Sequence, residues 1–277
     1  MTDGLTLSQR TAPFSLAVCA EMILLEMPIL ERVRYLAQKG FLVEIWDWTR
    51  HDLKNLAATG AVFSSMTGYI NGTLADDQGA AEMLRTAALS IQAARELGIP
   101  RLNLHGTGLG PDGLPVVKCL NGPDGAMWMK ARDTLSRLAD LGESAGVMFV
   151  LENLNAAVDH PAVPFGRAQD CAALVRSVDH PSLRLMLDLY HAQIGEGDLI
   201  SLLRKTQPLI GEIQIADVPG RCEPGTGEIN YPAIARALRE IGYTGVIGLE
   251  AWASDQDSER ALNRFVAAFS DSPSSEP

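Results

Sequence analysis

The chain has 277 residues, which is enough for one large core, and we expect a single domain over residues 1–277. Apolar residues make up 47% of the chain and charged residues 21%, a composition that excludes disorder of the whole chain. The formal net charge of −11 provides no basic stripe for phosphates, so nucleic acid is not an expected partner.

The start of the chain has no targeting pattern. The opening MTDGLTLSQR lacks an apolar core behind a basic start, and the later apolar run at 16–30 is interrupted by Glu21 and Glu26. We therefore expect a cytoplasmic protein without a membrane segment. The cysteines lie far apart without a CxxC pattern, which predicts reduced thiols and neither a zinc knuckle nor a disulfide framework; they are Cys19, Cys119, Cys171 and Cys222.

Short apolar runs of β-forming residues recur along the whole chain. In order they are 14–18, 41–46, 61–66, 101–105, 147–152, 183–188, 211–216 and 246–250. Helical periodicity lies between them, as in 81–98 and 129–146, and each of these two stretches ends at a glycine suited to a helix C-cap. Alternating strands and helices predict parallel strand pairing with helical crossovers.

Eight such units can form a closed barrel or a doubly wound open sheet. The glycine-rich phosphate turn of the open sheet is missing, since no GxGxxG follows a predicted strand and GTGLGPDG at 106–113 does not lead into a helix. Several strands are continuously apolar, which indicates burial on both faces. We therefore predict the α/β class and a single (β/α)8 TIM barrel with its core at about 14–269 and frayed N- and C-terminal tails.

Polar residues stand where the last four predicted strands stop. They are Glu152, Asp188, Gln214 and Glu250. Function in such barrels lies at the carboxyl ends of the strands, where these side chains would converge. Buried together they would repel one another unless a cation binds, and an all-oxygen set suits Mn²⁺, Mg²⁺ or Co²⁺.

The same residues resemble a known family. Glu152, the D-x-x-H of Asp188 and His191, the segment QIADVPGRCEPGTGEINY at 214–231 and the final GLE resemble the xylose isomerase-like barrels, and within them the hydroxypyruvate isomerases and their close relatives. The resemblance covers about 14–269. It implies that Glu152, Asp188, Gln214 and Glu250 are the metal ligands and that Glu152 and Glu250 are also the catalytic acid and base.

Four further residues are expected to contact the substrate. The resemblance implies this role for His191 and Arg221, and His105 and Trp46 stand at strand ends where they would face the pocket. We expect Arg221 over the end of the substrate remote from the metal ligands, because its planar guanidinium fork matches a carboxylate. His105 could equally be an ordinary hydrogen-bonded strand-end histidine.

The pattern predicts an isomerase that moves a carbonyl group through an enediolate in a small hydroxy-carbonyl acid or sugar. A keto-polyol (inosose-type) dehydratase and a neutral ketose epimerase stay open as alternatives, although Val158 stands where the related ketose 3-epimerases carry a further glutamate. A repair endonuclease of the same superfold is disfavoured because the five histidines are scattered. A long loop at 106–126 is expected to cover the site. The sequence leaves the assembly state open and allows a homo-oligomer.

Overall fold

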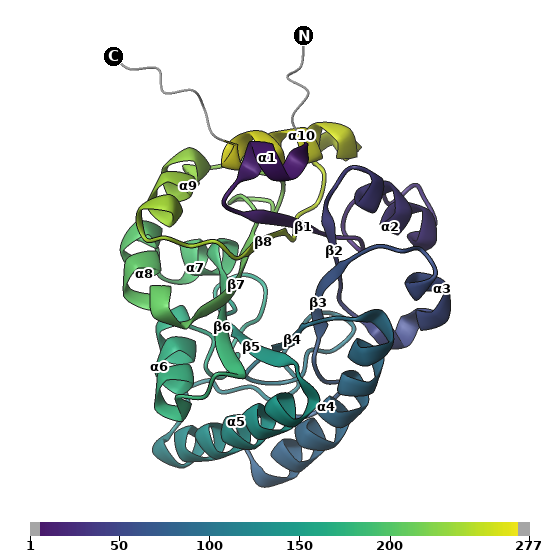
Figure 1. Cartoon of the computed structure of the whole chain (residues 1–277). Helices are drawn as coiled ribbons and strands as arrows, with labels where there is room; N and C mark the ends of the chain where they lie inside the picture. Colours follow the sequence, from purple (N-terminus) through teal and green to yellow (C-terminus); the bar gives the residue numbers. More distant parts are fainter. Residues whose placement is uncertain (1–5, 271–277) are drawn as a thin grey trace.

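Eight parallel strands close into a barrel in the computed structural model, which describes residues 6–270 (Figure 1). The strands are β1 (Ser15–Cys19), β2 (Leu42–Ile45), β3 (Phe63–Thr67), β4 (Arg101–Leu104), β5 (Met148–Glu152), β6 (Leu183–Asp188), β7 (Ile210–Ile215) and β8 (Val246–Leu249). Each strand pairs with the next along the chain, and β1 pairs with β8 to close the ring. The predicted (β/α)8 TIM barrel is confirmed.

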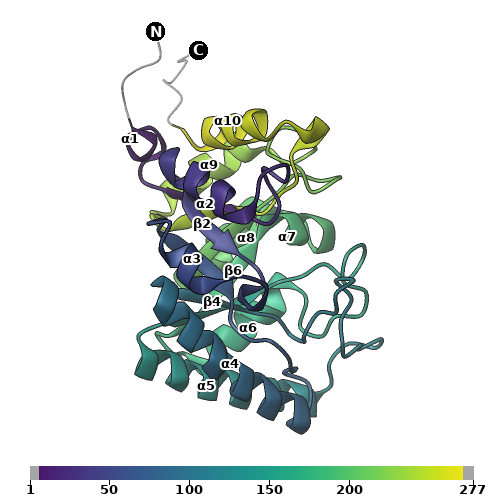
Figure 2. The ribbon, with the colours of Figure 1, turned by 90° about the vertical axis from the view of Figure 1, so that its right-hand side faces the viewer.

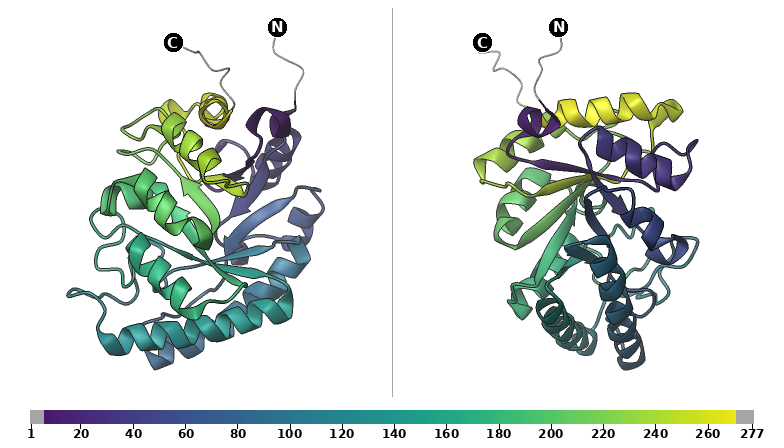
Figure 3. Two further views of the ribbon diagram at one scale, coloured as in Figure 1. Left: turned by 60° about the vertical axis from the view of Figure 1, so that its left-hand side comes forward. Right: turned by 45° about the vertical axis from the view of Figure 1, so that its right-hand side comes forward.

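Helices cover the outside of the barrel in both views of Figure 3. The α-helices are α1 (Leu7–Thr11), α2 (Ile29–Gln38), α3 (Leu53–Ala57), α4 (Asp77–Leu97), α5 (Gly125–Ala145), α6 (Ala168–Val178), α7 (Leu189–Gly195), α8 (Leu199–Thr206), α9 (Tyr231–Glu240) and α10 (Ser258–Phe269). Short 3-10 helices are η1 (Trp48–Arg50), η2 (Gln207–Leu209) and η3 (Ser254–Gln256). The helix α1 lies beside α10, next to the seam where β8 meets β1.

The core explains why the strands are continuously apolar. Phe149, Val150 and Leu151 follow one another on β5 and all three are fully buried, since one face of the strand meets the barrel interior and the other meets helices. Every predicted strand overlaps an observed one, and the run at 183–188 matches β6 at both ends.

Helix starts are less well predicted than helix ends. The two predicted helices end at Gly98 and Gly146, both in the left-handed conformation with φ of +68° and +72°. They begin four residues earlier than periodicity indicated, because Asp76 and Asp124 cap them by accepting a hydrogen bond from the backbone N–H group of the third residue of each helix.

The expected frayed tails fall partly on residues 1–5 and 271–277, which lie outside the described residues. Residues 7–11, which we expected to fray, form α1 instead. The Thr6 side chain and the Gln9 side chain each accept from the other's backbone N–H group, a reciprocal cap that accounts for this short helix.

Long irregular loops project beyond the barrel on one side (Figure 2). They include the segments 105–124 after β4 and 153–167 after β5, which are held together by a hydrogen bond from the Cys119 backbone N–H to the Ala162 carbonyl. The four cysteines are free thiols, as predicted. Within residues 6–270 we find no helix long and apolar enough to cross a membrane.

The β5 core provides a test of the packing. Phe149→Ala removes a fully buried ring, so the free energy of unfolding in urea should fall by about 3–5 kcal/mol. Leu120→Ala is the control, because Leu120 is 85% exposed and its removal should change stability by less than about 0.5 kcal/mol. Equal effects of the two substitutions would contradict this description of the core.

Candidate metal centre and active site

Strand register brings the predicted residues to one end of the barrel. Asp188 on β6 is paired with Gln214 on β7, and Gln214 is paired with Gly248 on β8. Glu152 is the last residue of β5, and Glu250 directly follows β8, with its backbone N–H donating to Ile215. The four side chains therefore come from successive strands at the carboxyl face, where barrel enzymes carry their sites.

A cavity of about 520 Å³ opens at this face. Six of the predicted site residues line it: Trp46, His105, Glu152, His191, Arg221 and Glu250. Asp188 and Gln214 do not line it and are only 1% and 4% exposed. Leu109, Gly110, Pro111 and Gly113 also line the cavity, so the long loop after β4 forms part of its wall, as expected.

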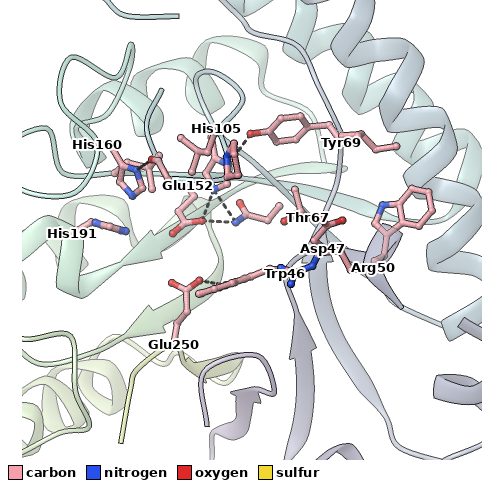
Figure 4. Close-up of a pocket in the computed structure, with 18 of the residues that line it drawn as sticks. Trp46, Asp47, Arg50, Thr67, Tyr69, His105, Glu152, His160, His191 and Glu250 are labelled. Atoms are coloured by element: carbon pink, nitrogen blue, oxygen red, sulfur yellow. Dashed lines mark hydrogen bonds and ion pairs between the residues drawn. The ribbon is translucent and has the colours of Figure 1, made fainter. Parts of the chain in front are cut away.

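Two carboxylates and an imidazole form the tightest group. Glu152, Asp188 and His191 each offer a ligand atom, and these atoms lie within 4.8 Å of one another. Glu250 is not part of this group. It forms an ion pair with Arg221 at 2.6 Å, and it accepts a hydrogen bond from the Trp46 indole (Figure 4).

The buried acids disfavour one another's ionisation. Burial, together with the charge of Glu250, raises the pKa of Glu152 to about 8. Burial and the charges of Glu152 and Glu250 raise the pKa of Asp188 well above its ordinary value. Glu152, Asp188 and Glu250 are thus close to one another, and Arg221, which is paired with Glu250, is the cation beside them. Part of the negative charge of the ionised acids lacks a counter-ion.

Glu152 is fixed by neighbours at the end of β4 and directly after it. The Asn103 amide donates to Glu152 Oε2, and His105 Nε2 lies 3.1 Å from the same oxygen. On its other side, His105 Nδ1 is 2.8 Å from the Tyr69 hydroxyl. Burial lowers the pKa of His105 to about 4, so its ring is neutral near pH 7. His105 therefore lines the cavity and also supports Glu152.

The protonation state of His191 follows from Asn155. The Asn155 side-chain oxygen accepts from the backbone N–H groups of Val158 and Asp159 at 2.9 and 3.0 Å, which fixes the orientation of the amide. Its nitrogen therefore faces His191 Nδ1 at 2.7 Å and donates to it. Burial lowers the pKa of His191 well below its ordinary value, so the neutral ring carries its proton on Nε2.

This tautomer decides between two possible roles of His191, that of a metal ligand and that of a hydrogen-bond donor. A neutral imidazole binds a metal through an unprotonated nitrogen, but Nε2 bears the proton and Nδ1 is occupied by Asn155. His191 Nε2 is buried without a hydrogen-bond partner among the described residues. It is therefore suited to donate a hydrogen bond to a substrate oxygen, despite its position beside Glu152 and Asp188.

Gln214 is oriented by Glu44. Its amide nitrogen donates to Glu44 Oε2 at 3.0 Å, and its oxygen is buried without a partner among residues 6–270. Gly248 makes room for both side chains, since an added Cβ would lie 2.4 Å from Glu44 and 2.5 Å from Gln214. The arrangement leaves the Gln214 oxygen available as an acceptor or a ligand.

The segment after β7 carries Arg221. Asp217 is fully buried and accepts from the backbone N–H groups of Val218, Gly225 and Ile229 at 2.9–3.0 Å, which folds the segment back on itself. Arg221 has a φ of +53°, in the left-handed region, and its carbonyl accepts from the backbone N–H of Trp252. Its guanidinium lies over the Tyr190 ring. Arg221 thus stands beside Glu250, and not remote from the predicted ligands as we expected.

The donor set fits a divalent cation. Glu152 and Asp188 are buried with raised pKa values, and the Gln214 oxygen lacks a partner, so a cation would satisfy groups that the described protein atoms leave unsatisfied. Glu250 could join them only by giving up contacts with Arg221 or Trp46.

Sequence reasoning missed four residues of the site: Tyr69, Asn103, Asn155 and His160. Asn103 and His105 are two residues apart at the end of β4, a spacing that places both on one face and could have identified Asn103. His160 received no role, yet it lines the cavity and lies 2.7 Å from the Gly113 carbonyl. Asn155 and His160 lie on the loop after β5, and only the fold brings this loop to the site.

Comparisons with known proteins identify the family of this barrel. The model of the xylose isomerase-like TIM barrel family matches residues 39–268. A putative hydroxypyruvate isomerase of Homo sapiens is 30% identical over 230 residues, which cover 79% of this chain and 82% of that protein. A 2-oxo-tetronate isomerase of Haemophilus influenzae is 31% identical over 245 residues, covering 83% and 90%. The crystal structure of a family 2 AP endonuclease from Brucella melitensis has a TM-score of 0.80 and 26% identity, covering 93% and 99%.

The raised pKa of Glu152 makes stability depend on pH in chelator-treated protein. Folded Glu152 keeps its proton up to a pH of about 8, whereas the unfolded carboxyl releases it near 4.5. Between these values the folded state binds more protons, so the free energy of unfolding should fall as pH rises, by up to about 1.4 kcal/mol per pH unit for this group.

Urea denaturation from pH 5 to 8 measures this slope. Glu152→Gln should make the fall in the free energy of unfolding with pH less steep. Part of the fall should remain in this variant, because the pKa of Asp188 is raised in the same direction. The control Glu26→Gln changes an exposed glutamate and should keep the wild-type slope. An unchanged slope in Glu152→Gln would show that Glu152 ionises normally in the folded protein.

Proposed function

The chain belongs to the xylose isomerase-like TIM barrel family and is an isomerase, and from this premise we propose that it moves a carbonyl group in a small hydroxy-carbonyl acid with the help of a divalent cation. The observation that carries the proposal is a cavity lined by Glu152 and Glu250 together with two donors, His191 and Arg221, whose buried Nε2 and Nε atoms lack partners among the described residues. Carboxylates suit proton transfer, and the donors suit oxygens on which negative charge develops.

Glu152, Asp188 and Gln214 would hold the cation, with Glu250 as the fourth ligand. Such an ion, Mn²⁺, Mg²⁺ or Co²⁺, would supply Lewis-acid polarisation of the substrate carbonyl. The acidic oxygen donors, and the His191 tautomer that keeps the imidazole a hydrogen-bond donor, support this ligand set.

The proton steps fall to the two glutamates. They come from β5 and β8 and approach the cavity from different sides (Figure 4). One glutamate, as a carboxylate, takes the proton from the hydroxyl-bearing carbon next to the carbonyl group, and the other, in its protonated form, gives a proton to the former carbonyl carbon. The hydroxyl proton passes to the former carbonyl oxygen. His191 and Arg221 donate hydrogen bonds to the enediolate oxygens formed between these steps.

The relatives support an acid substrate, since their names refer to hydroxypyruvate and 2-oxo-tetronate. A neutral ketose epimerase and an inosose-type dehydratase remain the alternatives to be assayed. Val158, at the position where the ketose 3-epimerases have a glutamate, is 66% exposed and does not line the cavity. This geometry favours the acid isomerase over the epimerase.

Three of the five histidines do meet in the cavity, which bears on the alternative of a repair endonuclease. They are His105, His160 and His191. The expectation that they are scattered was wrong for these three. Each has a ring nitrogen committed to a protein group, to Tyr69, to the Gly113 carbonyl and to Asn155, respectively. That commitment, with the net charge of −11, favours the isomerase over cleavage of DNA.

Cation binding should stabilise the protein. Addition of Mn²⁺ at about 100 times its Kd should raise the free energy of unfolding by about 2.7 kcal/mol, because the ion binds the folded state. Asp188→Asn should lose most of this gain, and Glu143→Gln on the surface should keep it. The measurement is thermal unfolding with Mn²⁺ or with a chelator. An Asp188→Asn variant with the full wild-type gain would remove Asp188 from the ligand set.

Turnover tests the function itself. Purified protein with Mn²⁺ or Mg²⁺ should interconvert hydroxypyruvate or a 2-oxo-tetronate with its carbonyl isomer, faster than it acts on free ketoses, inososes or abasic-site DNA. Glu152→Gln and Glu250→Gln should each lower kcat by about 100-fold or more, because each removes a proton carrier. Glu143→Gln is again the control. A glutamine variant with a near-normal rate would assign the proton transfer to another residue, and turnover of only ketoses, inososes or DNA would replace the proposal.

A further inference from the structure

Two arginines line the cavity, and they differ in their contacts. Arg221 is paired with Glu250. Arg50 lies at the exposed end of η1 and forms no ion pair or side-chain hydrogen bond with any residue in the described part of the chain. Asp47 is close in sequence and also lines the cavity, but its side chain accepts from Thr49 instead. Arg50 is therefore the cavity's uncommitted positive charge.

The backbone that carries Arg50 is firmly anchored. His51 Nε2 lies within hydrogen-bond distance of a mostly buried Glu21 oxygen, at 2.9 Å, and the other Glu21 oxygen accepts from the backbone N–H groups of Trp46 and Asp47. On the far side, the Trp48 indole donates to Ser90 on α4 at 3.0 Å. These contacts fix the segment and leave the Arg50 side chain free to bind a ligand, a form of preorganisation.

Arg50 lies on a different side of the cavity from Glu152 and Glu250, which we call the acid cluster. Figure 4 places it across the cavity from His191 and His160, beside Asp47. The cavity of about 520 Å³ is in the range that accommodates drug-sized ligands, so a small keto acid held at Glu152 and Glu250 would leave room on the Arg50 side. A longer substrate could reach both groups at once.

The charged residues that line the cavity indicate which kind of ligand group its Arg50 side would bind. The cavity wall contains Asp47, Glu152 and Glu250, in a chain of net charge −11, so an anion would be repelled unless a cation receives it. The planar guanidinium of Arg50 matches the oxygens of a carboxylate or a phosphate in a bidentate geometry. A neutral hydroxyl would accept fewer of its hydrogen bonds and would bring no opposite charge.

We infer that the substrate is a longer hydroxy-carbonyl acid that carries a second anionic group, a carboxylate or a phosphate, at the end remote from the acid cluster, and that Arg50 binds this group. The inference rests on the proposed function for the position of the reacting end. The unpaired arginine, its anchored segment and the unused volume of the cavity support it independently of turnover.

Calorimetric titration of the full-length protein with three matched probes, in buffer with Mn²⁺, tests the inference without turnover. Erythronate ends in a hydroxymethyl group, tartrate has a second carboxylate in its place, and 4-phosphoerythronate has a phosphate. At least one of the two dianionic probes should bind about 10-fold or more tightly than erythronate, because a charge-assisted hydrogen bond is added. The preferred probe identifies the anion as a carboxylate or a phosphate.

Substitutions assign the preference to Arg50. Arg50→Gln should abolish the difference between the probes without weakening erythronate, and Arg50→Lys should restore part of it. The control Arg34→Gln removes an exposed charge on α2, away from the cavity, and should change nothing.

Three results would overturn the inference: no preference for either dianionic probe, no measurable binding of them at millimolar concentration, or a preference that survives in Arg50→Gln. If the preference depends on Arg50 but none of the acids is isomerised, the proposed function fails and the assignment of Arg50 stands. If small acids are isomerised and Arg50→Gln has no effect on binding, the inference fails alone.

Discussion

The burial of several carboxylates at one end of an apolar barrel is the constraint on which the site depends. Glu152 and Asp188 are 3% and 1% exposed, and burial, with the charge of Glu250 on both and that of Glu152 on Asp188, makes their ionisation less favourable. The surrounding contacts are arranged to hold this charge. Arg221 faces Glu250, Asn103 donates to Glu152, and the backbone N–H of His191 donates to Asp188. A cation at this place would relieve repulsion that the protein groups only partly offset.

Residues behind the acids set the direction of each polar atom. Asn155 fixes His191 as a donor, because backbone N–H groups hold the Asn155 oxygen and leave only its nitrogen to face the ring. Glu44 acts on Gln214 in the corresponding way, and the amide oxygen of Gln214 is left free. Hydrogen bonds one layer away from the cavity thus leave His191 Nε2 and the Gln214 oxygen unpaired among the described residues, so these atoms would be available to a substrate or an ion.

The cavity also has two ends with different chemistry. Glu152, Glu250 and His191 make the inner end suited to proton transfer and to oxygens that gain negative charge. The outer wall comes from η1 and from the loop after β4, which His160 holds through the Gly113 carbonyl. Loops on a rigid barrel can change without altering the strands, so under the proposed function this outer wall would decide substrate preference and the strand ends would carry the reaction.

The sequence by itself determined the eight strands, their parallel order and the four polar residues at the strand ends, because a continuously apolar run of strand length and the helical period between two such runs each show within one segment. It also predicted Trp46 and His105 in the cavity, where strand ends converge. Only the tertiary structure decided which groups pair. Arg221 lies against Glu250 because Asp217 folds the segment after β7 back on itself, and His191 joins Glu152 and Asp188 with a proton on Nε2 because a loop from β5 supplies Asn155. The role proposed for Arg50 has no sign in the sequence, because a lone arginine in a turn can acquire one only when the fold places it in a cavity.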